Sequence, residues 1–116
     1  MIDDMSRPRP RPPRRRRLNE PDLQAMASDF RAAVERAGVP ADETEPSDRM
    51  HNHGEPYEAV IGYMELANEY RVPLPGHWLG LLRVWDAAGD LDDSGGRYII
   101  EEYLPNIEAI DETTGV

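Results

Sequence analysis

Residues 55–70 read EPYEAVIGYMELANEY, and this segment has more apolar side chains than a single face of a helix can carry. On a helical wheel of about 100° per residue, the apolar side chains cover most of the circumference: Tyr57, Val60, Ile61, Met64 and Ala67 in one arc, extended by Ala59, Tyr63, Leu66 and Tyr70. A helix with so wide an apolar surface packs against several neighbours. We therefore predict a helix over about 55–70 at the centre of the fold.

The remaining sector of this predicted helix is acidic. It holds Glu55, Glu58, Glu65 and Glu69, with Gly62 among them. No neighbouring Lys or Arg pairs with these carboxylates, so their mutual repulsion costs stability. A cationic partner would offset that cost, whereas a purely structural explanation is that the acids keep a small bundle soluble. The pattern predicts an exposed negative stripe.

A second helix is predicted on the N-terminal side of this segment. Asn19 is a favourable capping residue, and apolar residues then recur at three- and four-residue spacing as far as Ala37. Gly38, followed by Val39-Pro40, is a strong stop signal. The sequence therefore predicts a helix from about 20 to 37.

The segment between these two helices is polar. Residues 41–54 are rich in Asp and Glu and are interrupted by Pro46. Because no apolar stripe is present, we predict a connection here, with at most one helical turn around 47–50.

Two further helices are predicted on the C-terminal side. The helix over about 75–88 directs four residues inward: Trp78, Leu81, Leu82 and Trp85. The short, stiff connection Val72-Pro73-Leu74-Pro75 favours antiparallel pairing of this helix with the one before it. Residues 98–104 predict the last helix, although Tyr98-Ile99-Ile100 also has the composition of a strand. Ile107 and Ile110 are expected to pack from one further turn.

These elements predict the fold class: an all-α bundle of about four helices, residues 19–116, preceded by a disordered arm, residues 1–18. About a hundred residues suffice for one hydrophobic core and one domain. The chain has no Cys, and no apolar run approaches the roughly 20 residues that span a bilayer. No apolar segment follows the arginines of the arm, so they do not form a secretory signal. We expect a cytoplasmic protein.

The charge of the chain is divided between the arm and the domain. Residues 1–17 contain seven Arg and two Asp, a formal charge of +5, whereas the remaining residues contain six Arg and 21 Asp and Glu, a formal charge of −15. The arm alternates Arg with Pro and has nothing to bury, so we expect an extended, disordered segment. It could contact nucleic acid, anionic lipid or the acidic domain itself, or be only a solvated tail.

The chemical motifs in the sequence are weak. His51, His53 and Glu55 could chelate a metal ion, but no fourth ligand lies at a suitable spacing. Residues 90–96 resemble a calcium loop only loosely, because the Asp register and the final Glu are missing. No nucleophile motif and no phosphate-binding glycine loop occur. We therefore expect no catalytic residues, no metal site, no cofactor and no enzymatic activity.

A characteristic order of helix boundaries runs from Asp48 to Asp92. It comprises a polar turn ending in Gly54-Glu55, the helical segment Tyr57-Glu58-Ala59-Val60-Ile61, the exit Glu69-Tyr70, the hinge Val72-Pro73-Leu74, and Leu81-Leu82 leading to Gly89-Asp90-Leu91-Asp92. In this order the segment, about 45 of 116 residues, resembles the MafI-type immunity proteins, small acidic partners encoded beside polymorphic toxins. The Arg/Pro arm lies outside the resemblance.

The resemblance implies a binding protein that neutralises its cognate toxin by occluding the active site. Many such toxins are nucleases or other cationic enzymes, for which an acidic helical face is a suitable partner. The expected partner-binding residues are Glu55, Glu58, Glu65 and Glu69, extended by Asp86, Asp90, Asp92 and Asp93. Two alternatives are a nucleic-acid-binding or regulatory protein anchored by its arm, and an inhibitor that mimics DNA through the same acids. The oligomeric state stays open.

Overall fold

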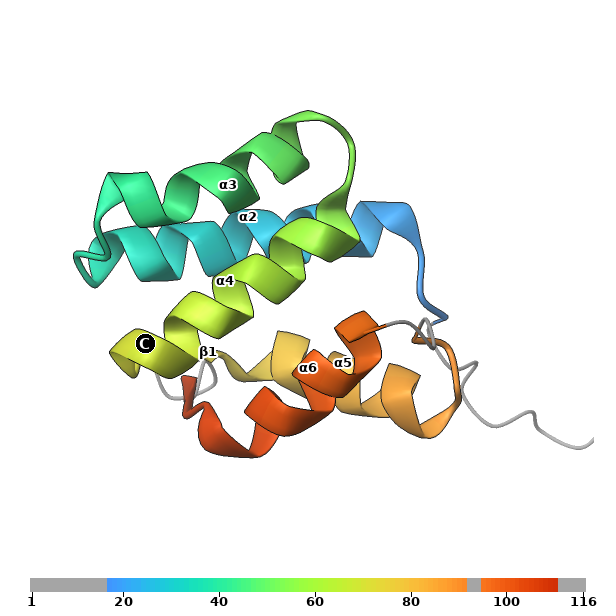
Figure 1. The fold of residues 1–116 in the computed structure, drawn as a ribbon. Helices are drawn as coiled ribbons and strands as arrows, with labels where there is room; N and C mark the ends of the chain where they lie inside the picture. Colours follow the sequence, from blue (N-terminus) through green and yellow to red (C-terminus); the bar gives the residue numbers. More distant parts are fainter. Residues whose placement is uncertain (1–16, 92–94, 111–116) are drawn as a thin grey trace, which may run out of the picture.

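Five α-helices make up most of residues 17–91 and 95–110, the part of the chain that this computed structural model describes (Figure 1). In chain order they are α2 (Glu20–Arg36), α3 (Ala41–Asn52), α4 (Pro56–Tyr70), α5 (Gly76–Ala87) and α6 (Gly95–Tyr103). The 3-10 turn η1 (Leu104–Asn106) follows α6, and the strands β1 (Leu74–Pro75) and β2 (Ala109–Ile110) pair in parallel. The predicted all-α bundle is confirmed.

Two expectations cannot be compared with the structure. The arm up to residue 16 and the two acids Asp92 and Asp93 lie outside the described residues. Within the described ranges, no helix combines the length and the apolar character that a membrane crossing needs.

Helix α4 lies at the centre of the bundle, as the sequence predicted. It packs against α2, α3 and α6, and Figure 1 shows it crossing between the α2–α3 pair and the α5–α6 layer. Val60, Tyr63 and Met64 are completely buried along it. Burial on several sides explains why apolar residues cover most of the α4 surface.

Helix α2 has the predicted boundaries. The Asn19 side chain caps it by accepting a hydrogen bond from the Asp22 N–H at 2.9 Å. Met26 and Phe30 are completely buried against the core. The helix stops before Gly38, whose φ of +88° is accessible to glycine at little cost.

Replacing Asn19 with alanine should destabilise the protein by about 1 kcal/mol, because one N–H of the first turn of α2 loses its acceptor. Urea unfolding followed by circular dichroism measures this loss. Gln24→Ala, at an exposed interior position of the same helix, is the matched control and should change stability little. Equal losses in the two variants would contradict the capping role.

Residues 41–52 form the helix α3, so the prediction of a connection with at most one helical turn was wrong. No hydrophobic side chain of α3 is buried; its buried residues are Thr44 and Ser47. Apolar periodicity therefore gave no signal. Asp42 and Glu43 lie in its first turn, where negative charge is favourable, and Pro46 removes one backbone donor from the helix interior.

Helix α5 contributes both tryptophans to the core, as predicted. Trp85 is completely buried, and the Trp78 indole Nε1 donates a hydrogen bond to Asp29 Oδ2 on α2 at 2.6 Å. The close backbone neighbours of α5 are β1 and β2, so the predicted antiparallel pairing with α4 was wrong. The prolines keep the connection extended, and the Leu74 N–H donates to the Glu108 carbonyl at 3.0 Å. The C-terminal segment therefore pairs with this connection.

Residues 95–103 form a helix, α6, rather than a strand. Ile100, Leu104 and Ile107 are buried, as their positions in the predicted helix and turn require. Tyr98 is 70% exposed, and Ile110 lies in β2, not in a further helical turn. A helix buries only the stripe that faces its neighbours, and Tyr98 falls outside that stripe.

Candidate functional site: an acidic face along α4

The glutamates of α4 are exposed, as the sequence predicted. Glu58, Glu65 and Glu69 lie within about 40° of one another around the helix, and all three are exposed. We call them the α4 stripe. Glu55 is also exposed, but it precedes the helix as its N-cap residue, with non-helical φ and ψ of −117° and 67°. The stripe is therefore a narrow exposed sector of α4, and neighbouring helices cover the faces on either side of it.

Gly62 does not belong to the exposed sector in which the sequence placed it. A Cβ atom added to Gly62 would lie 2.0 Å from Ser47 Oγ of α3. The glycine is thus the point at which α3 approaches α4 closely. Its position corrects the predicted stripe: Gly62 lies beneath α3, and the carboxylates lie beside it.

Acidic residues of two other helices border the stripe. On α6, burial raises the pKa of the Tyr103 hydroxyl, and the charges of Glu65, Glu102 and Glu69 raise it further. Because these effects require proximity, Tyr103 lies near Glu65 and Glu69, and Glu102 is its neighbour in the chain.

On α3, Glu43 accepts a hydrogen bond from the hydroxyl of Tyr70, the last residue of α4. This bond, with burial and the charges of Glu43, Glu69 and Asp42, raises the pKa of Tyr70 to about 12. We use the term acidic face for Glu43, Glu58, Glu65, Glu69 and Glu102. Glu43 and Glu102 were not predicted as site residues, because only the tertiary packing brings α3 and α6 beside α4.

Three arginines of the folded domain, Arg31, Arg49 and Arg97, pair with carboxylates outside the stripe. Arg31 contacts Asp48 at 2.9 Å and Glu35 at 3.2 Å, and Arg49 pairs with Glu45. Arg97 of α6 contacts Asp86 at 3.2 Å and Glu101 at 3.3 Å. Within residues 17–91 and 95–110, no ion pair or hydrogen bond engages the carboxylates of the α4 stripe. Their charge is therefore available to a partner.

The other predicted contact residues do not extend the stripe. Asp86 lies on α5 and holds Arg97 of α6, so it serves the packing of those two helices. Asp90 follows α5, where its backbone N–H donates to the Trp85 carbonyl at 2.8 Å. Helix α5 has few close backbone contacts with α4, so the structure separates these two aspartates from the glutamates.

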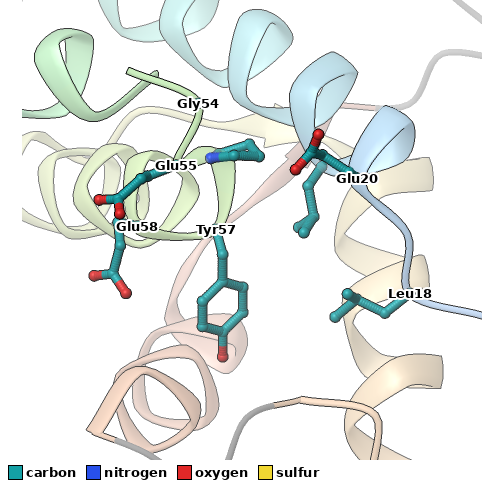
Figure 2. Close-up of a pocket in the computed structure, with 8 residues that line it drawn as sticks. Leu18, Glu20, Gly54, Glu55, Tyr57 and Glu58 are labelled. Atoms are coloured by element: carbon teal, nitrogen blue, oxygen red, sulfur yellow. The ribbon is translucent and has the colours of Figure 1, made fainter. Parts of the chain in front are cut away.

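A shallow depression opens at the N-terminal end of α4 (Figure 2). Apolar side chains of Leu18, Leu23, Pro56 and Tyr57 line it together with the carboxylates of Glu20, Glu55 and Glu58. Leu23 and Pro56 are buried, and Leu18 and Tyr57 are half-buried. We call this the N-terminal depression. Glu58 belongs both to this depression and to the α4 stripe.

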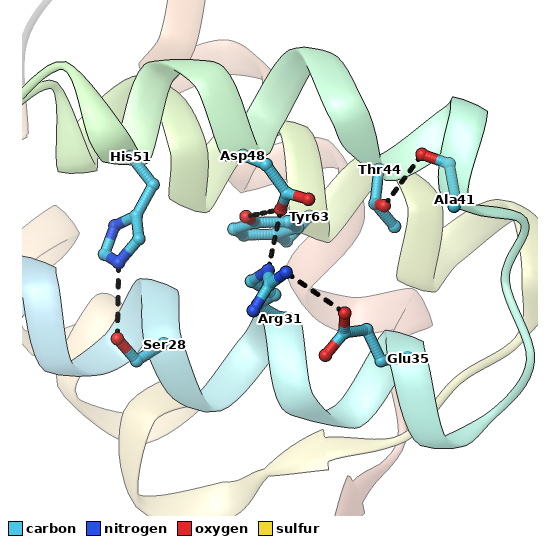
Figure 3. A network of polar contacts seen from close by, with 8 residues as sticks. All are labelled: Ser28, Arg31, Glu35, Ala41, Thr44, Asp48, His51 and Tyr63. Carbon is cyan, nitrogen blue, oxygen red and sulfur yellow. Dashed lines mark hydrogen bonds and ion pairs between the residues drawn. The ribbon is translucent and has the colours of Figure 1, made fainter.

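A polar network joins α2, α3 and α4 (Figure 3). Asp48 accepts hydrogen bonds from the Arg31 guanidinium, at 2.9 Å, and from the Tyr63 hydroxyl. Burial raises the pKa of Tyr63, and the bond to Asp48 raises it further. The hydrogen bond from the Arg31 guanidinium to the Asp48 carboxylate is charge-assisted. The network thus attaches α3, which buries no hydrophobic side chain, to the rest of the bundle.

His51 lies in the same interface. Its Nε2 is 3.3 Å from Ser28 Oγ, while its buried Nδ1 has no hydrogen-bond partner among the described residues. Nucleophilic catalysis by a serine normally uses a histidine oriented by a third group, and no such group contacts Nδ1 here. The described part of the chain also brings together no three His, Cys, Asp or Glu side chains able to hold a metal ion. Through Ser28, His51 makes a contact between α3 and α2.

The geometry defines a helical bundle with an acidic face, and on the central helix the carboxylates of this face form no ion pair with the residues that the structure describes. Comparisons with protein-family models, with curated proteins and with solved structures found no match to this chain.

Proposed function

We propose that this protein is a binding protein of the immunity type, which neutralises a cationic protein toxin by covering its active site with the acidic face. The observation that carries the proposal is the set of carboxylates on α4 that pair with no side chain in residues 17–91 and 95–110. Glu58, Glu65 and Glu69 project from a helix that is otherwise largely buried, whereas Arg31, Arg49 and Arg97 neutralise acids elsewhere. Like charges so placed disfavour the free protein and favour a complex with a cation.

The rigidity of α4 supports the same function. The backbone that carries the stripe is held by α2, α3 and α6, so little conformational entropy is lost when a partner binds. The exposed Tyr70 and half-buried Tyr103 lie beside the carboxylates and offer rings to arginine or lysine side chains. A rigid surface of this composition suits an enzyme whose cleft attracts phosphate groups.

Reversing two charges of the stripe, Glu58→Arg with Glu65→Arg, should abolish protection of a host that expresses the toxin gene adjoining the gene for this chain. Association with the purified toxin should slow by roughly tenfold or more at low salt, and the difference should shrink as salt rises. Growth of the co-expressing host and stopped-flow association kinetics measure the two effects.

The matched control is Glu35→Arg with Glu108→Arg, which makes the same change in net charge at two exposed positions outside the acidic face. Circular dichroism verifies that both double variants fold. If the stripe variant still protects the host, or associates at the unaltered rate at low salt, the proposed contact surface is wrong.

A further inference from the structure

The N-terminal arm joins the folded domain beside its acidic surface. Leu18 is half-buried and lines the N-terminal depression with Glu20, Glu55 and Glu58, and Figure 2 shows these side chains around the same opening. Arg17 is exposed and directly precedes Leu18. The residues before Arg17 lie outside the described part of the chain. They are therefore attached to the domain next to the acidic rim of the depression.

The composition of the arm complements that surface in two ways. Residues 6–17 read SRPRPRPPRRRR, seven arginines and four prolines with no acid among them. Proline-rich segments dock in grooves lined by aromatic residues, and the depression offers Tyr57 beside Leu23 and Pro56. The guanidinium groups would face Glu20, Glu55 and Glu58 on the rim.

The reach of the arm matches the length of the α4 stripe. Arg14 to Arg17 lie one to four residues from Leu18, which corresponds to at most about 14 Å of extended chain. Arg7 to Arg11 lie seven to eleven residues away, up to roughly 40 Å. Along α4, Glu69 lies about 17 Å from the first turn, at 1.5 Å per residue. The nearer arginines can therefore reach the depression, and the farther ones Glu65 and Glu69.

We propose that the arm, residues 6–17, binds in cis to the N-terminal depression and to the α4 stripe, and so occupies the acidic surface of its own chain. Tethering gives the arm an effective concentration near the millimolar range, although each exposed ion pair is weak. The contact therefore forms in the isolated protein and reopens readily. If the proposed function holds, a toxin must displace the arm before it binds the acidic face. A partner with little positive charge would therefore not bind.

The test uses the full-length chain. Since the sequence contains no Cys, Ser6→Cys introduces a single site for a nitroxide label without changing the charge. Paramagnetic relaxation of backbone amides then reports which surface the label visits. We expect enhanced relaxation of the amides from residue 54 along α4 to residue 69. This enhancement should fall by roughly twofold or more in about 1 M NaCl, where the Debye length is about 3 Å.

The matched variants remove equal charge at different places. Glu55→Gln, Glu58→Gln and Glu65→Gln together should reduce the α4 enhancement, whereas Glu35→Gln, Glu45→Gln and Glu108→Gln together should leave it unchanged. Enhancement that is insensitive to salt, or that falls equally in both triple variants, would overturn the proposal. The salt comparison needs no substitution in the acidic surface, so it tests the cis contact even if a triple variant fails to fold.

This experiment contains no toxin, so its outcome is independent of the protection experiment. Relaxation confined to α4 without host protection would support the cis contact and refute the immunity function. Host protection with salt-insensitive relaxation would support the immunity function and refute the cis contact.

Discussion

Replacing Trp85 with alanine should destabilise the protein by roughly 3–5 kcal/mol and lower its melting temperature by more than about 10 °C. Trp85 of α5 is the largest completely buried side chain, so truncation removes much apolar volume from the core and leaves a cavity. Thermal and urea unfolding followed by circular dichroism measure the loss.

The neighbouring residue provides the control for Trp85. Val84 is 42% exposed on the same helix, so Val84→Ala removes apolar atoms from the surface and should cost less than about 1 kcal/mol. Trp85→Phe, which keeps an aromatic ring in the core, should fall between the two. Similar losses for Trp85→Ala and Val84→Ala would show that α5 does not pack as described.

Replacing Gly62 with valine should destabilise the protein by about 1–3 kcal/mol, because the new side chain overlaps α3. Even a Cβ atom would lie 2.0 Å from Ser47 Oγ and 3.1 Å from Ser47 Cβ. Gly80 of α5 is the matched control, since a Cβ there meets no atom within 4 Å. Gly80→Val should be neutral or slightly stabilising, because valine is a better helix former than glycine.

A compensating substitution tests the mechanism of the Gly62 effect. Ser47→Gly removes the atoms that the new side chain would meet, so the double variant should be more stable than the sum of the two single losses predicts. A double-mutant cycle by urea unfolding measures this coupling. Strict additivity would mean that the α3–α4 contact at Gly62 is not the cause of the loss.

Where apolar periodicity was strong, the fold could be predicted from sequence. The boundaries of α2 and α5 agree with the prediction to within about a residue, and those of α4 to one residue at its start, because caps, Gly38 and the prolines mark them. The same reasoning missed α3. Its only buried residues are polar or small, so the helix depends on contacts of Asp48 with Arg31 and Tyr63 on other helices.

The candidate site was predictable to a similar extent. Exposure of Glu58, Glu65 and Glu69 followed from their shared sector on a largely apolar helix. The contribution of Glu43 and Glu102 did not, since each comes from a different helix. Asp86 appeared equivalent to the glutamates in sequence but is engaged by Arg97 in the fold.

The sequence by itself determined that a mostly apolar helix over about 55–70 lies at the centre of a bundle and exposes a line of carboxylates. It did so because helical periodicity is local: residues three and four apart share a face in any surroundings. Only the tertiary structure decided which acids are neutralised, that Gly62 lies beneath α3, and which acids of other helices border the stripe. Those properties depend on distances between residues remote in sequence, and electrostatic interactions are set by such distances.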